Sequence, residues 1–225
     1  IPWHRDEVDM FTFHLTVPAG VDRIDVRFQF PARDRVTPNL MGLEWNAVAL
    51  YYAGYPTREE IYQPTLVIPD GWGYASALKT ESRNGGRIKF GPVPFNTLVD
   101  SPVIAGQYFR EIDVTPPASP VHRYLDLVGD SAGAIAISDA QIAGYRRLVE
   151  QAQALFRSHH YDDYHFLLTA SDYTSKGGLE HHRSSDDRAR SGAKIFADAD
   201  HFMLDGSLLP HEYTHSWNGK FMRPA

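Results

Sequence analysis

The stretch Ser207–Asn218, with the sequence SLLPHEYTHSWN, decides the fold of the second part of this 225-residue chain. His211 and His215 stand four residues apart in it, and Glu212 directly follows the first histidine. Two leucines before the motif and a tryptophan after it indicate a partly buried helix. Four residues turn a helix by about 400°, so both imidazoles lie on one face, about one turn apart.

This arrangement of side chains predicts a site for one zinc ion. Two imidazoles at this spacing can bind the same ion at about 2.1 Å. Glu212 projects beside them, where its carboxylate can take a proton from a zinc-bound water, whose pKa the metal lowers toward about 7. The alternative is a chance match to a short motif, and the helical context argues against it. We therefore predict His211 and His215 as metal ligands and Glu212 as the catalytic general base.

Composition limits the other functions open to this chain. Apolar residues make up 43% of it and charged residues 22%, as in ordinary globular proteins. The net charge of −6 and the lack of a basic cluster argue against nucleic acid as a partner. No apolar run is long enough to predict a transmembrane segment. The absence of Cys excludes disulfides, thiol catalysis and cysteine zinc sites.

The first 130 or so residues read as β structure. Residues 11–17 and 24–30 alternate apolar and polar side chains on either side of a Pro-Ala-Gly turn, which predicts a hairpin. Proline and glycine punctuate the gaps between further short strands, which suggests a sandwich. We expect these strands at residues 47–52, 65–68, 75–79, 87–90, 106–114 and 122–128.

The pattern changes after this point. Ser138 and Gln141 form a capping box before an apolar stripe of helical period, which predicts a helix over residues 139–157. Residues 164–170 read as a buried strand and residues 177–185 as an extended segment led by two glycines. The fold class is therefore predicted as α+β. The expected domains are an N-terminal all-β domain, residues 1–130, and a second domain, residues 131–225, that carries the predicted zinc helix and that the resemblance described next identifies as the first part of a catalytic domain.

With its flanks, the motif resembles the zinc helix of the glycyl aminopeptidase family of metallopeptidases. The matching residues are HEYTHSWN at 211–218, then Lys220 and Arg223-Pro-Ala225. Gly177-Gly-Leu-Glu-His181 resembles the second signature of that family. The stretch Leu98–Pro102 with Gly106, and Gly71-Trp72, are also similar. The likeness runs from about Phe11 to the last residue.

The resemblance implies an N-terminal β domain followed by a thermolysin-like α/β zinc-peptidase domain of the gluzincin type. It implies an aminopeptidase that hydrolyses the first bond of peptides, with a small first residue such as Gly or Ala. Glu180 would hold the free amino group of the substrate, and Gly177 and Gly178 would let the peptide approach the backbone. From the residues alone, a solvated turn residue is the favoured interpretation of Glu180.

The resemblance also implies a third zinc ligand, a Glu on a later helix, and no Glu follows Glu212 here. We therefore expect a fragment, cut before the third ligand and at its Ile1 start, that is inactive alone. A periplasmic or secreted location is favoured over a cytoplasmic one. Two other functions stay open, namely a zinc endopeptidase that does not use Glu180 and a non-catalytic protein-interaction module derived from a peptidase.

Several other aromatic and imidazole side chains are expected to have structural places rather than site roles. Tyr213, Trp217 and Phe221 are predicted as core residues. The remaining histidines of this part are expected at the surface, in the core or behind the ligands; they are His159, His160, His165, His182 and His201.

Overall fold

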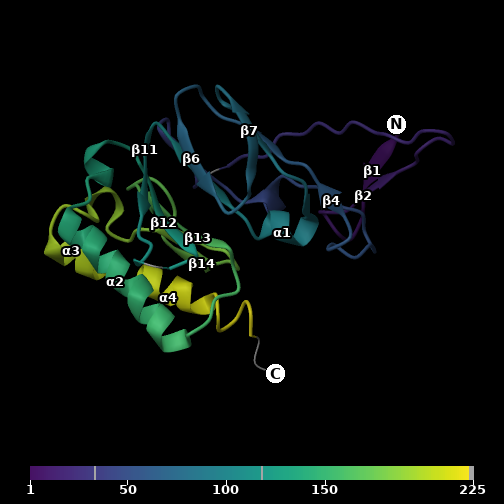
Figure 1. Cartoon of the computed structure of the whole chain (residues 1–225). Coiled ribbons are helices and arrows are strands. Elements are labelled where there is room, and N and C mark those ends of the chain that lie inside the picture. The colour runs from purple at the N-terminus through teal and green to yellow at the C-terminus, as the bar shows by residue number, and fades with distance from the viewer. Residues whose placement is uncertain (33, 118, 223–225) are drawn as a thin grey trace. The chain divides into compact units, whose positions relative to one another are not determined.

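The computed structural model describes residues 1–32, 34–117 and 119–222. The chain divides into two compact units, Ile1–Pro31 and Ala32–Ala225 (Figure 1). In the first unit β1 (Trp3–Arg5) pairs antiparallel with β2 (Phe13–Leu15). The rings of Trp3 and Phe13 meet edge to face at 5.8 Å across this pair.

The hairpin predicted between residues 11–17 and 24–30 is wrong. β2 lies inside the first of these segments, but its partner is β1, and residues 24–30 form no strand. Alternation shows only which face of a strand would be buried, whereas a strand exists only where a neighbour completes its backbone hydrogen bonds. Phe28 and Phe30 are about half exposed, so no core draws this segment into a sheet.

The second unit begins with small antiparallel sheets. Their orders are β3-β10-β6, β5-β8-β7 and β4-β9. Trp45, Ile88, Phe90 and Phe95 contribute to their shared core. The bounds are β3 Leu40–Leu43, β4 Ile61–Tyr62, β5 Thr65–Val67, β6 Gly73–Ser76, β7 Thr80–Asn84, β8 Arg87–Phe90, β9 Val93–Pro94 and β10 Val103–Gly106, with η1 at Trp45–Ala47 and α1 at Phe95–Val99.

A mixed five-stranded sheet follows, in the order β11-β12-β13-β15-β14. The three central strands are parallel, and both outer strands run antiparallel to their neighbours. The bounds are β11 Tyr108–Asp113, β12 His122–Gly129, β13 Asp163–Ala170, β14 Gly177–Glu180 and β15 Ser184–Arg188; η2 spans Gly133–Ile135, η3 Gly192–Lys194 and α3 Ala199–Leu204.

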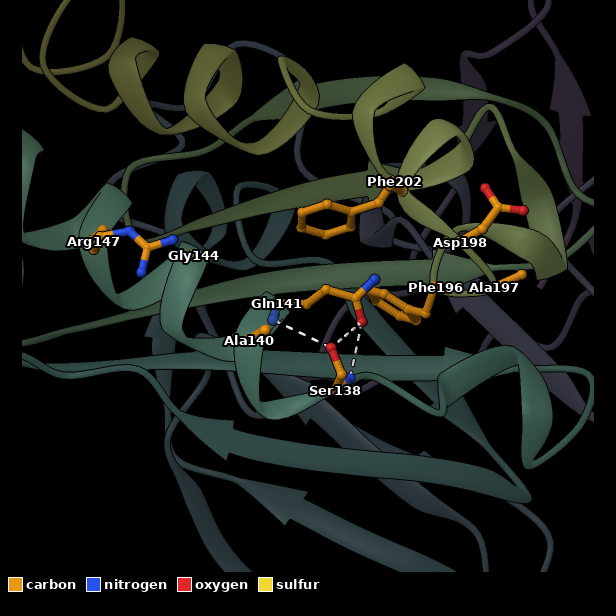
Figure 2. Close-up of a pocket in the computed structure, with 10 residues that line it drawn as sticks. Ser138, Ala140, Gln141, Gly144, Arg147, Phe196, Ala197, Asp198 and Phe202 are labelled. Atoms are coloured by element: carbon orange, nitrogen blue, oxygen red, sulfur yellow. Dashed lines mark hydrogen bonds between the residues drawn. The ribbon is translucent and has the colours of Figure 1, made fainter.

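Helix α2 (Asp139–Phe156) connects β12 to β13, as a parallel pair requires. Ser138 caps its first turn, and the capping box with Gln141 is formed in both directions. Its apolar stripe packs into the main core between the sheet and the helices. Figure 2 shows a pocket between the start of α2 and α3, lined by Ser138, Gln141, Arg147 and Phe202 among others. None of the predicted site residues lines it.

The fold class is α+β, as predicted. The predicted helix 139–157 and the predicted strands at residues 65–68, 87–90, 122–128 and 164–170 are confirmed to within a residue or two. The strand expected at residues 47–52 is wrong, because the short helix η1 occupies its start. The boundary predicted between residues 130 and 131 stays a prediction. The five-stranded sheet spans it, since β11 and β12 lie on one side and β13 on the other.

Among the described residues, no helix has the length and apolar character needed to cross a membrane.

Candidate active site

The helix predicted from the opening motif is present as α4 (Leu208–His215). Its Pro210 lies in the first turn, where a backbone N–H would have no helical partner in any case. Leu209 and Tyr213 are almost fully buried in the main core. His211 lies two residues from each of them and therefore about 200° around the helix, so it faces away from the core.

Aromatic packing fixes the orientation of this helix. The hydroxyl groups of Tyr213 and Tyr161 lie 2.6 Å apart in the core. Trp217 stacks on Phe156 at the end of α2, with ring centroids 4.3 Å apart, and its indole N–H donates to the carbonyl of Ser158 at 3.1 Å. Tyr213 and Trp217 are thus core residues, as predicted. Phe221 is not, because 65% of it is exposed.

His211 and His215 present their Nε2 atoms to each other at 3.1 Å. The Nδ1 atom of His215 lies 3.0 Å from the carbonyl oxygen of Asn218. A carbonyl only accepts, so Nδ1 carries the hydrogen and the lone pair of Nε2 is free to bind a metal. Two nitrogens of a tetrahedral zinc shell would be roughly 3.4 Å apart, close to the observed distance.

Glu212 lies beside this pair, since potential ligand atoms of His211, Glu212 and His215 all lie within 4.8 Å of one another. Two imidazoles at this distance suit zinc as two of its protein ligands, and the Glu212 carboxylate lies close enough to act as a base toward a zinc-bound water. The residues present therefore fit the ion that the sequence predicts.

Glu212 lies against the backbone of β14. A Cβ atom added at Gly178 would come within 2.0 Å of its Oε1 atom, so only glycine leaves room for this carboxylate. Burial raises the pKa of Glu212, and the negative charge of Glu180 raises it further, while His211 and His215 act in the opposite direction. The predicted general base and the predicted amine-binding residue therefore share one electrostatic environment.

Strand β14 carries the other predicted site residues. Gly177 has a φ of +127°, a conformation that side chains rarely adopt. Glu180 ends the strand opposite Ser185 of β15 and is partly exposed. β14 is the last strand of its sheet, so its outer edge has no strand partner among the described residues. An edge of this kind can receive an extended peptide as an added strand.

Sequence reasoning missed a carboxylate behind this strand. Asp100 directly follows α1, and its oxygens accept hydrogen bonds from His181, His182 and Lys220. These partners lie more than 80 positions further along the chain, so no local pattern could reveal the cluster. His160 and His182 contact the segment after α4, since the hydroxyl of Ser216 lies 3.0 Å from Nε2 of His160 and donates to the carbonyl of His182.

Comparison with solved structures identifies the fold. A protein of the aminopeptidase N family from Idiomarina loihiensis superposes with a TM-score of 0.64 at 22% identity, over 83% of this chain and 32% of the other. Native yeast LTA4 hydrolase gives a TM-score of 0.50 at 12% identity, over 80% of this chain and 27% of the other. The chain thus has the fold of part of these two proteins and spans about a third of the length of the first.

Family profiles identify the chain more closely. The profile described as Peptidase M61 N-terminal domain matches residues 1–107, and the profile M61 glycyl aminopeptidase matches residues 205–225. Together the two matches cover more than half of the sequence. The chain belongs to the M61 glycyl aminopeptidase family. A comparison with curated proteins found no match.

Proposed function

We propose that the protein is a zinc-dependent aminopeptidase that hydrolyses the N-terminal peptide bond of peptides, with a preference for a small first residue. The observation that carries this proposal is the pair of Nε2 atoms 3.1 Å apart on α4, with Glu212 held between that helix and β14. The family resemblance supports the exopeptidase activity and the preference for Gly or Ala.

His211 and His215 would hold the zinc ion, and the family resemblance predicts a glutamate as the third protein ligand. When bound, zinc would supply a Lewis acid that makes a water molecule acidic enough to attack a carbonyl. The hydrogen bond from His215 to the Asn218 carbonyl supports this role, because it fixes the ring with Nε2 as the donor atom.

The side chains of this chain would move the proton and place the substrate. Glu212 takes a proton from the attacking water at its carboxylate and later delivers it to the nitrogen of the leaving amine. Glu180 binds the free α-amino group, so the bond that is cut is set by its distance from the N-terminus. The peptide lies along the outer edge of β14, where Gly177 leaves its backbone room to approach, while the space beside Gly178 holds the carboxylate of Glu212.

Substitution of the general base tests this proposal in the whole natural protein. Glu212→Gln keeps the shape of the side chain and leaves both imidazoles in place. We expect bound zinc close to the wild-type amount and a loss of turnover of at least about 100-fold, the usual contribution of a general base. Zinc would be measured by mass spectrometry and turnover with alanyl and glycyl 4-nitroanilides. Retained turnover would remove Glu212 from the mechanism.

The same assays separate the two other candidate functions. A zinc endopeptidase would cut N-acetylated and free peptides equally well. A non-catalytic interaction module would show no turnover in the wild type, with or without added zinc.

A further inference from the structure

Hydrogen bonds connect the segment after α4, residues 216–222, to the end of β14, the strand that carries Glu180. The carbonyl of His182, in the turn between β14 and β15, accepts a hydrogen bond of 3.0 Å from the hydroxyl of Ser216, the residue directly after His215. A second link between the same two segments runs through Asp100, at the end of α1 in the preceding β region.

The carboxylate of Asp100 is only 19% exposed and meets four donors. Its Oδ2 atom accepts from the backbone N–H of His182 at 2.9 Å and lies 2.8 Å from the Nδ1 atom of the same residue. Its Oδ1 atom lies 3.2 Å from Nδ1 of His181 and accepts from the ammonium of Lys220 at 2.9 Å. One side chain therefore joins α1, the β14–β15 turn and the segment after α4.

His181 has a feature that a purely structural network of hydrogen bonds would not need. Its side chain is 5% exposed, and its Nε2 atom is buried without a hydrogen-bond partner among the described residues. Buried polar atoms are nearly always paired, and the exceptions gather at functional sites. His181 directly follows Glu180, so this unpaired nitrogen belongs to the residue next in the chain to the proposed amine-binding position.

We propose that Asp100 is a positioning residue of the peptidase site, which fixes Glu180 relative to the metal-binding helix by holding His181 and His182 on one side and Lys220 on the other. The proposal rests on the proposed function of Glu180. In this role Asp100 does not touch the substrate, but fixes the position of the end of β14. Loss of its charge should therefore weaken the binding of the substrate amino group more than the chemical step.

The test uses Asp100→Asn in the whole natural protein, with Asp130→Asn as a matched control. Asp130 also accepts hydrogen bonds from two elements, through the hydroxyls of Thr37 and Ser171, but it follows β12 at the opposite end of the five-stranded sheet from the β14–β15 turn. Lys220→Gln is the second variant should Asp100→Asn fail to fold, because it removes only the partner on the helix side.

Two measurements are made on each variant. Hydrogen–deuterium exchange should rise in residues 177–185 and 216–222 of Asp100→Asn and stay at the wild-type level in residues 163–170. For an alanyl 4-nitroanilide we expect kcat/KM to fall about 10- to 100-fold, mainly through KM. In a Glu180→Ala background the same substitution should change kcat/KM by less than about threefold, because coupled residues are not additive. The control should change neither exchange in these segments nor KM.

The outcomes separate the two proposals. Unchanged hydrogen–deuterium exchange in both segments would refute the claim that Asp100 holds them together. Raised exchange with an unchanged KM, or an equal loss with and without Glu180, would refute the positioning role alone. A wild-type protein that does not cleave free-amine peptides would refute the proposed function and the positioning role with it.

Discussion

The contact between Gly178 and Glu212 gives the most sharply defined prediction. Gly178→Ala adds one methyl group on β14, and its carbon would lie 2.0 Å from Oε1, 2.4 Å from Cδ and 2.6 Å from Cγ of Glu212. An ordinary contact needs about 3.4 Å, so the carboxylate must move by roughly 1 Å or more. The strand cannot withdraw instead without breaking its pairing with β15.

A displacement of about 1 Å in a catalytic group can lower the rate about 100-fold, which corresponds to about 2.7 kcal/mol in the barrier. We therefore expect kcat of Gly178→Ala to fall about 100-fold, with bound zinc unchanged because both histidines keep their places. Turnover of an alanyl 4-nitroanilide and zinc content would be measured on the same preparations.

Gly133→Ala is the matched control, since a Cβ atom there would meet nothing closer than 3.8 Å, at the hydroxyl of Ser131. It should leave kcat within about twofold of the wild type. Full activity in Gly178→Ala would show that Glu212 does not need the place it has against β14, and the account of the general base would be wrong.

Three further predictions concern binding and stability. Glu180→Ala should lower kcat/KM for free-amine peptides by about 10- to 150-fold, the loss of a charge-assisted contact of roughly 1.5–3 kcal/mol; a wild type that also cleaves N-acetylated peptides equally well would assign Glu180 another task. Trp217→Ala should lower the free energy of unfolding by about 3–5 kcal/mol in urea titrations, because it removes the stack on Phe156, and a loss below about 1 kcal/mol would contradict that packing. Burial raises the pKa of Asp100, but hydrogen bonds from its histidine and lysine partners outweigh it and hold the pKa below its ordinary value. The stabilisation of the fold by ionised Asp100 is therefore complete above about pH 4 and is lost as the pH falls through the lower pKa of the folded state. The Tm difference between wild type and Asp100→Asn should consequently shrink below about pH 4. A Tm difference that grows there would contradict this sign.

Local patterns predicted the parts of the structure that local interactions determine. The capping box at Ser138 and the stripe behind it predicted α2 because both act within a few residues. The H-E-x-x-H spacing predicted which side chains of α4 share a face for the same reason.

Local sequence patterns did not predict strand β15. Its sequence, Ser-Ser-Asp-Asp-Arg, contains no apolar residue, yet its first four residues are buried in the sheet. Asp186 is stabilised there by the guanidinium of Arg35 at 2.7 Å, from a residue 151 positions earlier in the chain. A buried carboxylate depends on such a partner, and no pattern of neighbours identifies one that distant. The cluster around Asp100 was missed for the same reason.

The predicted hairpin of residues 11–17 and 24–30 failed in the opposite way. Its alternation was real, but pairing in the first unit joins residues 3–5 to residues 13–15. Periodicity constrains the faces of a strand and leaves its partner open.

The central claim is that His211, Glu212 and His215 form the zinc centre of an aminopeptidase. The most direct test measures zinc and product together in the whole natural protein. One zinc ion should be bound per chain. Removing it with 1,10-phenanthroline should abolish release of the first residue from an alanyl peptide, and adding back zinc should restore it, while the N-acetylated peptide stays intact. Unchanged cleavage by the zinc-free protein, or zinc bound at full stoichiometry by a His211→Ala/His215→Ala variant, would contradict the account.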